Sequence, residues 1–308
     1  MTSQMTKFNQ WVSSIADAGR ELLSRVDSRQ EKDQAITLLC RELSTSKGEA
    51  MGTAIAHEVV KAYQALSGEG KQAFFELLLN EYGPNPKHII ESAEQYRHNP
   101  GRSTYRALSH AIEAPRQNLF RRINMAPEGT ATLIQMRKDL LTLLPSDDGL
   151  RDVDTDLKHL MISWFNRGFL TLEQISWKTP AHILEKLIAY EAVHEMEGWD
   201  DLRRRLADDR RCFAFFHPAL EDEPLIFVEV ALEKGISSNV QCLLEAQNPD
   251  DVAAKADFDT AIFYSISNCQ EGLKGISFGN FLIKQVVMEL RNEFPQLKQF
   301  ATLSPIPG

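Results

Sequence analysis

The chain has 308 residues, of which 43% are hydrophobic and 25% are charged. Such a composition argues against disorder and against a fibrous protein, and the length allows two hydrophobic cores. The formal net charge of −9 argues against a broad nucleic-acid surface, because backbone phosphates need a positive field. We therefore expect no nucleic-acid partner. A phosphorylated ligand would need a local site made of basic side chains or backbone amides.

The N-terminal residues and the cysteines indicate in which cellular compartment the protein is expected. The start MTSQMTKFNQW has neither the apolar core of a secretion signal nor the arginine-rich character of a transit peptide. The most apolar runs, such as 225–232, have the length of a strand and fall far short of the ~20 residues of a membrane span. The four cysteines are scattered without a metal-binding pattern, which favours reduced and mostly buried thiols. We expect a cytoplasmic protein without a membrane or metal partner.

Residues 7 to about 166 show helical periodicity almost throughout. Gly83-Pro84-Asn85-Pro86 should end one helix and begin the next, with Asn85 as the cap and Pro86 at the first helical position. His57, His88, His98 and His110 are spread over different predicted helices and make no ligand pair. This half is therefore predicted to be a helical packing or assembly module. The expected helices cover 11–26, 30–43, 50–66, 71–82, 86–97, 104–123, 130–144 and 152–165.

After about residue 170 the pattern changes to a mixture of helices and strands. The runs 212–216, 224–232 and 260–267 are rich in Phe, Val, Leu and Ile and are predicted strands. Helices are expected over 180–192, 199–206 and 277–294, and a last strand over 298–303. Because a strand, a helix and a strand follow one another at the end, the last two strands should be parallel neighbours.

The turn between the strand 260–267 and the following helix contains three glycines, Gly272, Gly275 and Gly279. Glycines let a backbone approach a ligand closely, and free amides at a helix N-terminus suit a phosphate. Many such turns use glycine merely to turn, so both interpretations stay open from the pattern alone. The turn resembles the pyrophosphate loop of the acetyltransferase-like (GNAT) fold. The matching residues are Lys274, Gly275, Ile276, Ser277, Phe278 and Gly279, with Lys274 and Ser277 departing from the usual pattern.

Several longer stretches, in order and spacing, resemble malonyl-CoA decarboxylases. They are 161–177, 189–206, 209–225, 235–241, 261–284 and the terminal LSPIPG of 303–308. The resemblance implies a helical oligomerisation domain over 1–167 and a catalytic domain over 168–308, with a homo-oligomer (dimer or tetramer) as the assembly. The implied fold is α + α/β, an all-helical domain followed by an incomplete GNAT-like α/β domain.

The resemblance also implies an activity and its residues. Family members convert malonyl-CoA to acetyl-CoA and CO2 without a metal or an organic cofactor. Their catalysis is assigned to a Ser–His dyad whose serine corresponds to Ser304. The histidine belongs to a His-x-x-Asn-Gly-Ala segment downstream of residue 308, and none of the eight histidines here takes that role. We therefore expect a sequence truncated at its C-terminus. The alternatives are an acyl-CoA-dependent acyltransferase and a non-catalytic CoA-binding or assembly module.

Two smaller features have competing interpretations. The arginines of 203–205 and 210–211 could meet the 3′-phosphate of CoA, but a solvated helix face paired with neighbouring aspartates is favoured. His217 follows a predicted strand and is interpreted as a histidine of the core or of a loop edge.

Overall fold

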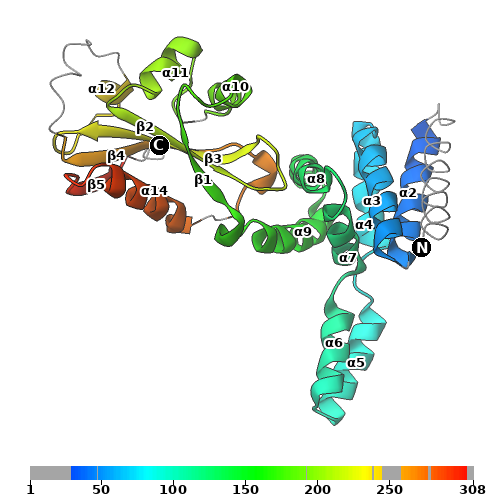
Figure 1. Cartoon of the computed structure of the whole chain (residues 1–308). Helices are drawn as coiled ribbons and strands as arrows, with labels where there is room; N and C mark the ends of the chain where they lie inside the picture. The colour runs from blue at the N-terminus through cyan, green and yellow to red at the C-terminus, as the bar shows by residue number, and fades with distance from the viewer. Residues whose placement is uncertain are drawn as a thin grey trace, which may run out of the picture. The chain divides into compact units, whose positions relative to one another are not determined.

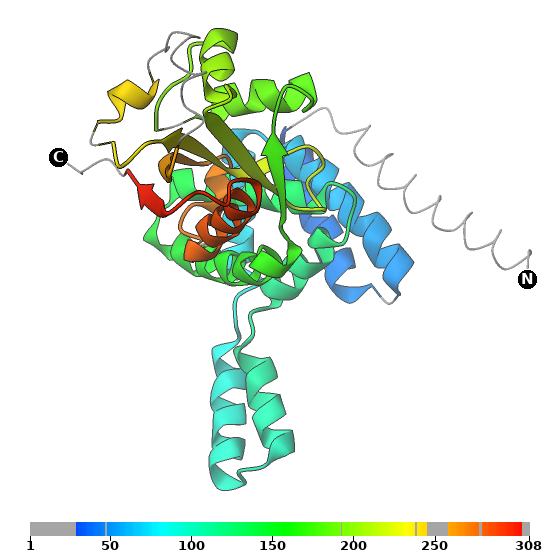
Figure 2. The ribbon, with the colours of Figure 1, turned by 60° about the vertical axis from the view of Figure 1, so that its left-hand side comes forward.

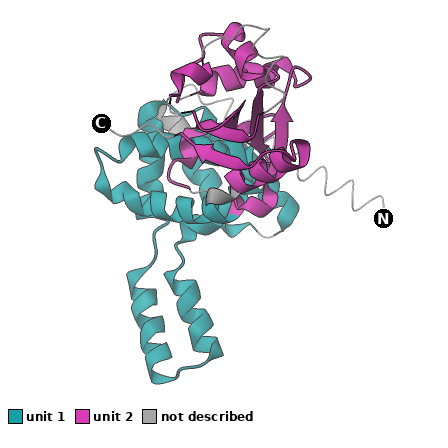
Figure 3. Cartoon of the chain, turned by 90° about the vertical axis from the view of Figure 1, so that its left-hand side faces the viewer, with its two compact units in different colours: residues 1–163 teal, residues 164–308 magenta. Residues whose placement is uncertain are grey.

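The computed structural model describes residues 29–46, 48–191, 193–237, 239–244, 258–276 and 279–303. The chain divides into two compact units, residues 1–163 and residues 164–308 (Figure 3). Helices make up the first unit, and a sheet with helices on its two faces makes up the second. This order confirms the predicted fold class. The predicted helix 11–26 lies outside the described residues, and the oligomerisation and catalytic roles of the two parts stay predictions.

The first part of the chain contains helices that mostly agree with the periodicity. Asn85 caps α5, since its Oδ1 accepts hydrogen bonds from the amides of Lys87 and His88. The single helix predicted over 104–123 is wrong, because the backbone turns at Ala114 and a new helix begins at Pro115. Proline cannot donate the backbone bond that a continuous helix needs there. The helices are α2 (Arg29–Thr45), α3 (Glu49–Gln64), α4 (Gly68–Asn80), α5 (Pro86–His98), α6 (Arg102–Ile112), α7 (Pro115–Asn124), α8 (Gly129–Leu143) and α9 (Arg151–Trp164).

Two buried ion pairs join α9 to its neighbours. The guanidinium of Arg116 on α7 contacts the carboxylate of Asp156 at 2.5 Å, and that of Arg137 on α8 contacts Asp154 at 2.8 Å. The two arginines are almost completely buried. By contrast, α5 and α6 pack against each other and bury no residue, and they project from the rest of their unit as a helical hairpin (Figures 1 and 2).

The second unit is built on a five-stranded sheet in the order β1-β2-β3-β4-β5. The first four strands are antiparallel, and β4 and β5 are parallel, as predicted. The sequence did not predict β1, a short strand with one buried residue. The strands are β1 (Thr171–Ile175), β2 (Arg210–Phe216), β3 (Pro224–Glu233), β4 (Thr260–Asn268) and β5 (Gln299–Thr302).

Helices cover both faces of this sheet (Figures 1 and 2). One face carries α10 (Ala181–Tyr190), α11 (Trp199–Arg205) and α12 (Gln241–Leu244), and the other carries α14 (Gly279–Glu293). Apolar side chains of α10 and α11 pack with Cys212, Ala214 and Phe227 of the sheet. Leu243 of α12 packs with Ala231, Ile262 and Tyr264 further along the same face. The strands β4 and β5, which α14 connects, form one edge of the sheet.

Candidate functional site

The strands β4 and β5 overlap for only part of their length. Residues Thr260–Phe263 of β4 pair with Gln299–Thr302 of β5, and the amide of Leu303 donates to the carbonyl of Phe263 at 2.9 Å. The strand β4 then continues to Asn268, paired there only with β3 within the described part of the chain. At about 3.3 Å per residue, these last five residues extend roughly 16 Å past the end of β5. Within the described residues, this half of β4 thus has an open edge without a strand partner, next to the point where β5 ends.

The turn after β4 is compact. A short 3-10 helix, η3 (Glu271–Leu273), is closed by the amide of Lys274, which donates to the carbonyl of Glu271 at 3.0 Å. The amide of Ile276 donates to the carbonyl of Leu273, also at 3.0 Å, so these two amides of the predicted phosphate loop are already engaged. Gly275 lies between them with a φ of 74°, a conformation that glycine adopts without strain.

The other residues of the predicted loop take different positions. Ile276 is buried, whereas Lys274 and Gly275 are exposed. Gly279 begins α14, so its amide belongs to the first helical turn. Ser277 and Phe278 lie outside the described residues. The amides that could face a phosphate are therefore those of the first turn of α14 rather than those of Lys274 and Ile276.

Ser304 also lies outside the described residues, and Leu303 is the last residue that the structure describes. The side chain of Leu303 packs against the cluster that contains Ile262 and Tyr264 of β4. The last described residue, Leu303, therefore lies beside the middle of β4.

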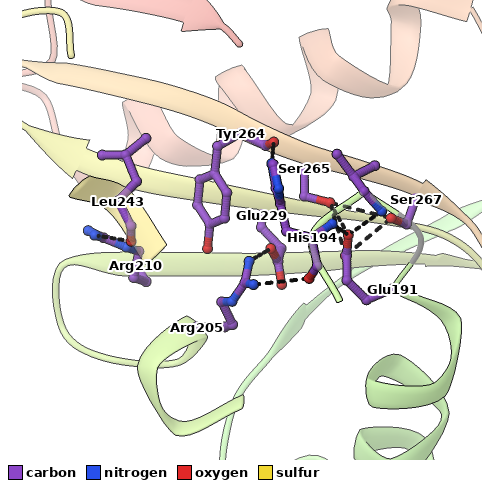
Figure 4. Close-up of polar contacts among 10 residues, drawn as sticks. Glu191, His194, Arg205, Arg210, Glu229, Leu243, Tyr264, Ser265 and Ser267 are labelled. Atoms are coloured by element: carbon purple, nitrogen blue, oxygen red, sulfur yellow. Dashed lines mark hydrogen bonds and ion pairs between the residues drawn. The ribbon is translucent and has the colours of Figure 1, made fainter. Parts of the chain in front are cut away.

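A buried carboxylate, Glu191, lies against the same half of β4 (Figure 4). Its Oε1 and Oε2 each lie 2.9 Å from the hydroxyl of Ser265, and Oε2 accepts from the hydroxyl of Ser267 at 3.1 Å. The backbone amides of Val193 and His194 donate to Oε1 at 2.8 and 2.7 Å. This single carboxylate therefore joins the loop after α10 to the carboxyl half of β4.

A second buried group adjoins the first. The guanidinium of Arg205 on α11 contacts Glu229 of β3 at 2.5 Å and donates to the carbonyl of His194 at 3.1 Å (Figure 4). Burial raises the pKa of Glu229 to about 8, despite the opposing effect of the Arg205 charge. The Oε1 atom of Glu229 and the hydroxyl of Tyr264 are buried without a hydrogen-bond partner among the described residues.

The arginines of 203–205 and 210–211 do not form one solvated face. Arg203 is exposed and pairs with Asp200 as expected, but Arg205 and Arg210 are buried. Arg210 contacts Asp209 at 2.8 Å and donates to the carbonyl of Leu243 at 2.8 Å, so it holds α12 to the sheet. The sequence missed this because it does not show which side of α11 packs on the sheet. Arg205 and Arg210 therefore bind partners inside the unit and do not contribute to a basic surface.

His217 has a structural environment, in agreement with its interpretation. Its ring packs on Phe165 with a centroid distance of 4.9 Å, and its Nδ1 accepts from the amide of Ala219 at 3.1 Å. Burial lowers the pKa of His217.

One sequence signal could have pointed to part of the Glu191 group. Ser265 and Ser267 alternate with apolar residues in the strand TAIFYSISN, which places both hydroxyls on one face. The partner carboxylate is 74 residues away from Ser265 in sequence, and no local pattern connects the two.

The described ranges contain no metal cluster, no membrane-spanning helix and no disulfide. No cluster of three or more His, Cys, Asp or Glu side chains there could hold a metal ion. No helix in those ranges is long and apolar enough to cross a membrane. The four cysteines are free thiols, and Cys40, Cys212 and Cys269 are buried whereas Cys242 is exposed.

The sequence matches two domain families. Residues 82–165 match the malonyl-CoA decarboxylase N-terminal domain, and residues 168–308 match the malonyl-CoA decarboxylase C-terminal domain. The mitochondrial malonyl-CoA decarboxylase of Mus musculus is 40% identical over 205 residues, which are 65% of this chain and 42% of that protein. The mitochondrial malonyl-CoA decarboxylase of Anser anser anser is 33% identical over 308 residues, covering 96% of this chain and 60% of that protein.

Solved structures agree with the sequence matches. Malonyl-CoA decarboxylase from Rhodopseudomonas palustris superposes with a TM-score of 0.83 at 48% identity, covering 90% of this chain and 67% of that chain. The enzyme of the same name from Agrobacterium vitis gives a TM-score of 0.81 at 50% identity, covering 89% and 66%. The chain spans 42% to 60% of the length of the two curated relatives above. From the two domain matches and these structures, the chain belongs to the malonyl-CoA decarboxylase family.

Proposed function

We propose that the protein decarboxylates malonyl-CoA to acetyl-CoA and CO2. The observation that carries the proposal is the C-terminal domain match, which runs over the whole β4–α14–β5 unit and the terminal LSPIPG. The relatives named above are malonyl-CoA decarboxylases. The proposal includes Ser304 as a catalytic residue and the first turn of α14 as the pyrophosphate site.

The chemistry needs few groups from the protein. Loss of CO2 leaves an electron pair on the α-carbon, which delocalises into the thioester carbonyl as an enolate. The thioester is thus its own electron sink, and we propose that no metal or organic cofactor takes part. The protein must stabilise the enolate oxygen with a preorganised donor and deliver a proton to the carbon. The hydroxyl of Ser304 would be the donor, and a histidine downstream of residue 308 would be the acid.

The offset between β5 and β4 supports an extended ligand. Ser304 directly follows Leu303, whose amide bonds to Phe263 in the middle of β4. The turn that leads into α14 begins roughly 16 Å further along the strand, at Asn268. A thioester near Ser304 and a pyrophosphate at the first turn of α14 would place the connecting arm of CoA along the open edge of β4.

The N-terminus of α14 suits a phosphate for physical reasons. The helix is 15 residues long, and its first amides have no partner within the helix. Gly275 allows the chain to reverse in a left-handed conformation just before it. Lys274 is exposed at the same turn and could add a positive charge. Positive ends of helices and backbone amides are common phosphate ligands.

The test is release of CO2 from malonyl-CoA by the full-length protein and by two variants. Ser304→Ala should lower kcat by about 100-fold or more, the usual effect of losing a group that stabilises an oxyanion. Ser109→Ala removes an exposed hydroxyl from α6 in the other unit and should leave the rate unchanged. Equal rates for the wild type and Ser304→Ala would remove Ser304 from the mechanism. Acyl transfer to an amine without CO2 release would indicate the acyltransferase instead, and CoA binding without turnover would indicate a non-catalytic module.

We also propose that the protein is a homo-oligomer that assembles through its helical part. The α5–α6 hairpin supports this, since it carries exposed apolar side chains on helices that bury no residue. Ile90, Tyr105 and Ile112 are each more than half exposed. Isolated apolar residues are common on surfaces, but several on one projecting hairpin suit contact with a second copy. The predicted cytoplasmic location stays a prediction, because it rests on N-terminal residues outside the described part.

Light scattering tests the assembly. The double variant Ile90→Glu/Ile112→Glu should have a lower molar mass than the wild type. Ile162→Glu is the matched control, because Ile162 is 51% exposed on α9, away from the hairpin. A double variant with the mass of the wild type would argue against the hairpin as the contact.

A further inference from the structure

The carboxyl half of β4 forms backbone hydrogen bonds with a neighbouring strand, β3, along only one of its edges within the described residues. Residues Ile266–Asn268 pair with β3, and the register shifts at Tyr264, which is left opposite no residue between the Glu229↔Ser265 and Val230↔Phe263 pairs. Bulges bend and twist a strand locally, and an edge without a neighbour lacks half of its hydrogen bonds. The position of this half of β4 therefore depends on side-chain contacts to its two faces.

Glu191 supplies those contacts on one face. Its side chain is buried with Ser265 and Ser267, each of which is about 1% exposed. Two hydroxyls and two backbone amides point at the carboxylate, with distances between 2.7 and 3.1 Å. A buried carboxylate is costly unless donors surround it, and hydrogen bonds to a charged acceptor are stronger than neutral ones. The four donors meet this requirement and fix both hydroxyls to one point.

His194 ties the same loop to the bulge. Its Nε2 lies 3.1 Å from the carbonyl oxygen of Tyr264. Because a carbonyl only accepts, this nitrogen must carry the proton. The carbonyl of His194 in turn accepts from Arg205, which is paired with Glu229 on β3. The loop after α10 is thus anchored directly to β4 and α11, and through Arg205 to β3. Figure 4 shows these contacts along one face of β4.

We propose that Glu191 is a positioning residue for the CoA thioester, acting through the Ser265 and Ser267 hydroxyls to set the open half of β4 and the turn into α14. This inference rests on the proposed function, because that function places CoA along β4. Glu191 itself is buried beneath the strand and need not touch the ligand. Its loss should therefore weaken CoA binding more than it slows the chemistry at Ser304.

Two substitutions of Glu191 distinguish the effect of its hydrogen bonds from the effect of its charge. Glu191→Gln keeps one acceptor oxygen for the two backbone amides, and its amide group can donate to serine hydroxyls, which also accept. Glu191→Ala removes all of these bonds. We expect Glu191→Ala to raise the KM for malonyl-CoA about tenfold, equivalent to ~1.4 kcal/mol, and to change kcat by less than about threefold. Glu191→Gln should keep KM within about twofold of the wild type.

A loss of stability alone must be distinguished from a loss of position. Asp156→Ala is the matched control, since it removes a carboxylate that pairs with buried Arg116 in the other unit. It should lower stability without changing KM. If Glu191→Ala does not fold, the smaller double variant Ser265→Ala/Ser267→Ala tests the same contacts. An unchanged KM for Glu191→Ala, or an equal rise for Asp156→Ala, would overturn the inference.

Two measurements do not depend on turnover of malonyl-CoA. Hydrogen exchange should be faster for the amides of Tyr264–Asn268 in Glu191→Ala than in the wild type, with Arg210–Phe216 of β2 unchanged. Calorimetry with CoA alone should show about tenfold weaker binding to that variant. If the wild type releases no CO2 but these changes are seen, the proposed activity fails and the positioning role stands. If the wild type is active and neither change is seen, the positioning role fails alone.

Discussion

The Nη1 atom of Arg205 lies 2.5 Å from Oε2 of Glu229, although the two side chains are 6% and 0% exposed. The pair connects α11 to β3 on the face of the sheet that α10, α11 and α12 cover. Removing two charges from water costs several kcal/mol for each ion, and their attraction offsets this only with good geometry. Because Oε1 of Glu229 has no partner among the described residues, the compensation is incomplete, and the carboxyl group favours its protonated form.

Glu229 should therefore make folding stability depend on pH. Burial raises its pKa from 4.5 to about 8. A raised folded-state pKa means that the folded protein binds the extra proton more tightly than the unfolded chain. The resulting stabilisation is fully present below pH 4.5 and is lost as pH rises from 4.5 to about 8. Glu229→Gln cannot ionise, so its free energy of unfolding, measured by urea denaturation, should fall less than that of the wild type over this range. Parallel curves for the two proteins would contradict the assignment.

Removing the arginine of this pair should be more harmful than removing an exposed one. Arg205→Met leaves the Glu229 carboxyl without its cation and the His194 carbonyl without a donor. At pH 9, where Glu229 is ionised in the folded protein, we expect the free energy of unfolding to drop by about 3–5 kcal/mol. Arg203→Met, two residues earlier, removes an exposed pair with Asp200 and should cost less than about 1 kcal/mol. Similar losses for both variants, measured by urea denaturation at pH 9, would show that the buried pair contributes no more to stability than the exposed one.

Local signals made most of the fold predictable. The Asn85 cap and Pro86 located the start of α5, and the strand–helix–strand pattern located the parallel pair β4 and β5. The strand β1 was missed because only Ile175 of its five residues is buried, which leaves little apolar alternation. The division at Pro115 was missed because apolar periodicity continues on both sides of it.

Only those parts of the candidate site whose residues are close together in the sequence were predictable. The turn before α14 and the segment after β5 are sequence-local, so their position could be inferred from one strand and one helix. The Glu191 carboxylate meets Ser265 from 74 positions away, and Arg205 meets Glu229 from 24 positions away. Such contacts depend on how α10 and α11 pack on the sheet. Periodicity shows that a helix has a buried face, but it does not show which strand residue that face meets.

The four cysteines should differ sharply in reactivity. Burial raises the pKa of Cys40 to about 12 and also raises the pKa values of Cys212 and Cys269. Thiolates are the reactive form, so these three should be inert in the folded protein. Cys242 is exposed on α12 and should react with a maleimide at neutral pH. Mass spectrometry should find one label on the wild type and none on Cys242→Ser. More than one label under native conditions would show that a buried thiol becomes accessible.

Gly129 should tolerate no side chain, since α8 begins where α7 has just ended. A Cβ atom at Gly129 would lie 1.9 Å from the carbonyl oxygen of Ile123, a backbone atom that cannot move aside without shifting the turn. Gly129→Ala should therefore lower the free energy of unfolding by about 1–3 kcal/mol, the usual cost of overpacking. Gly68 is the matched control, because it also begins a helix, yet a Cβ there would meet nothing within 4 Å. Gly68→Ala should be neutral or slightly stabilising, because alanine restricts the unfolded chain. Thermal unfolding of both variants measures the difference, and a Gly129→Ala protein as stable as Gly68→Ala would show that the α7–α8 turn relaxes freely.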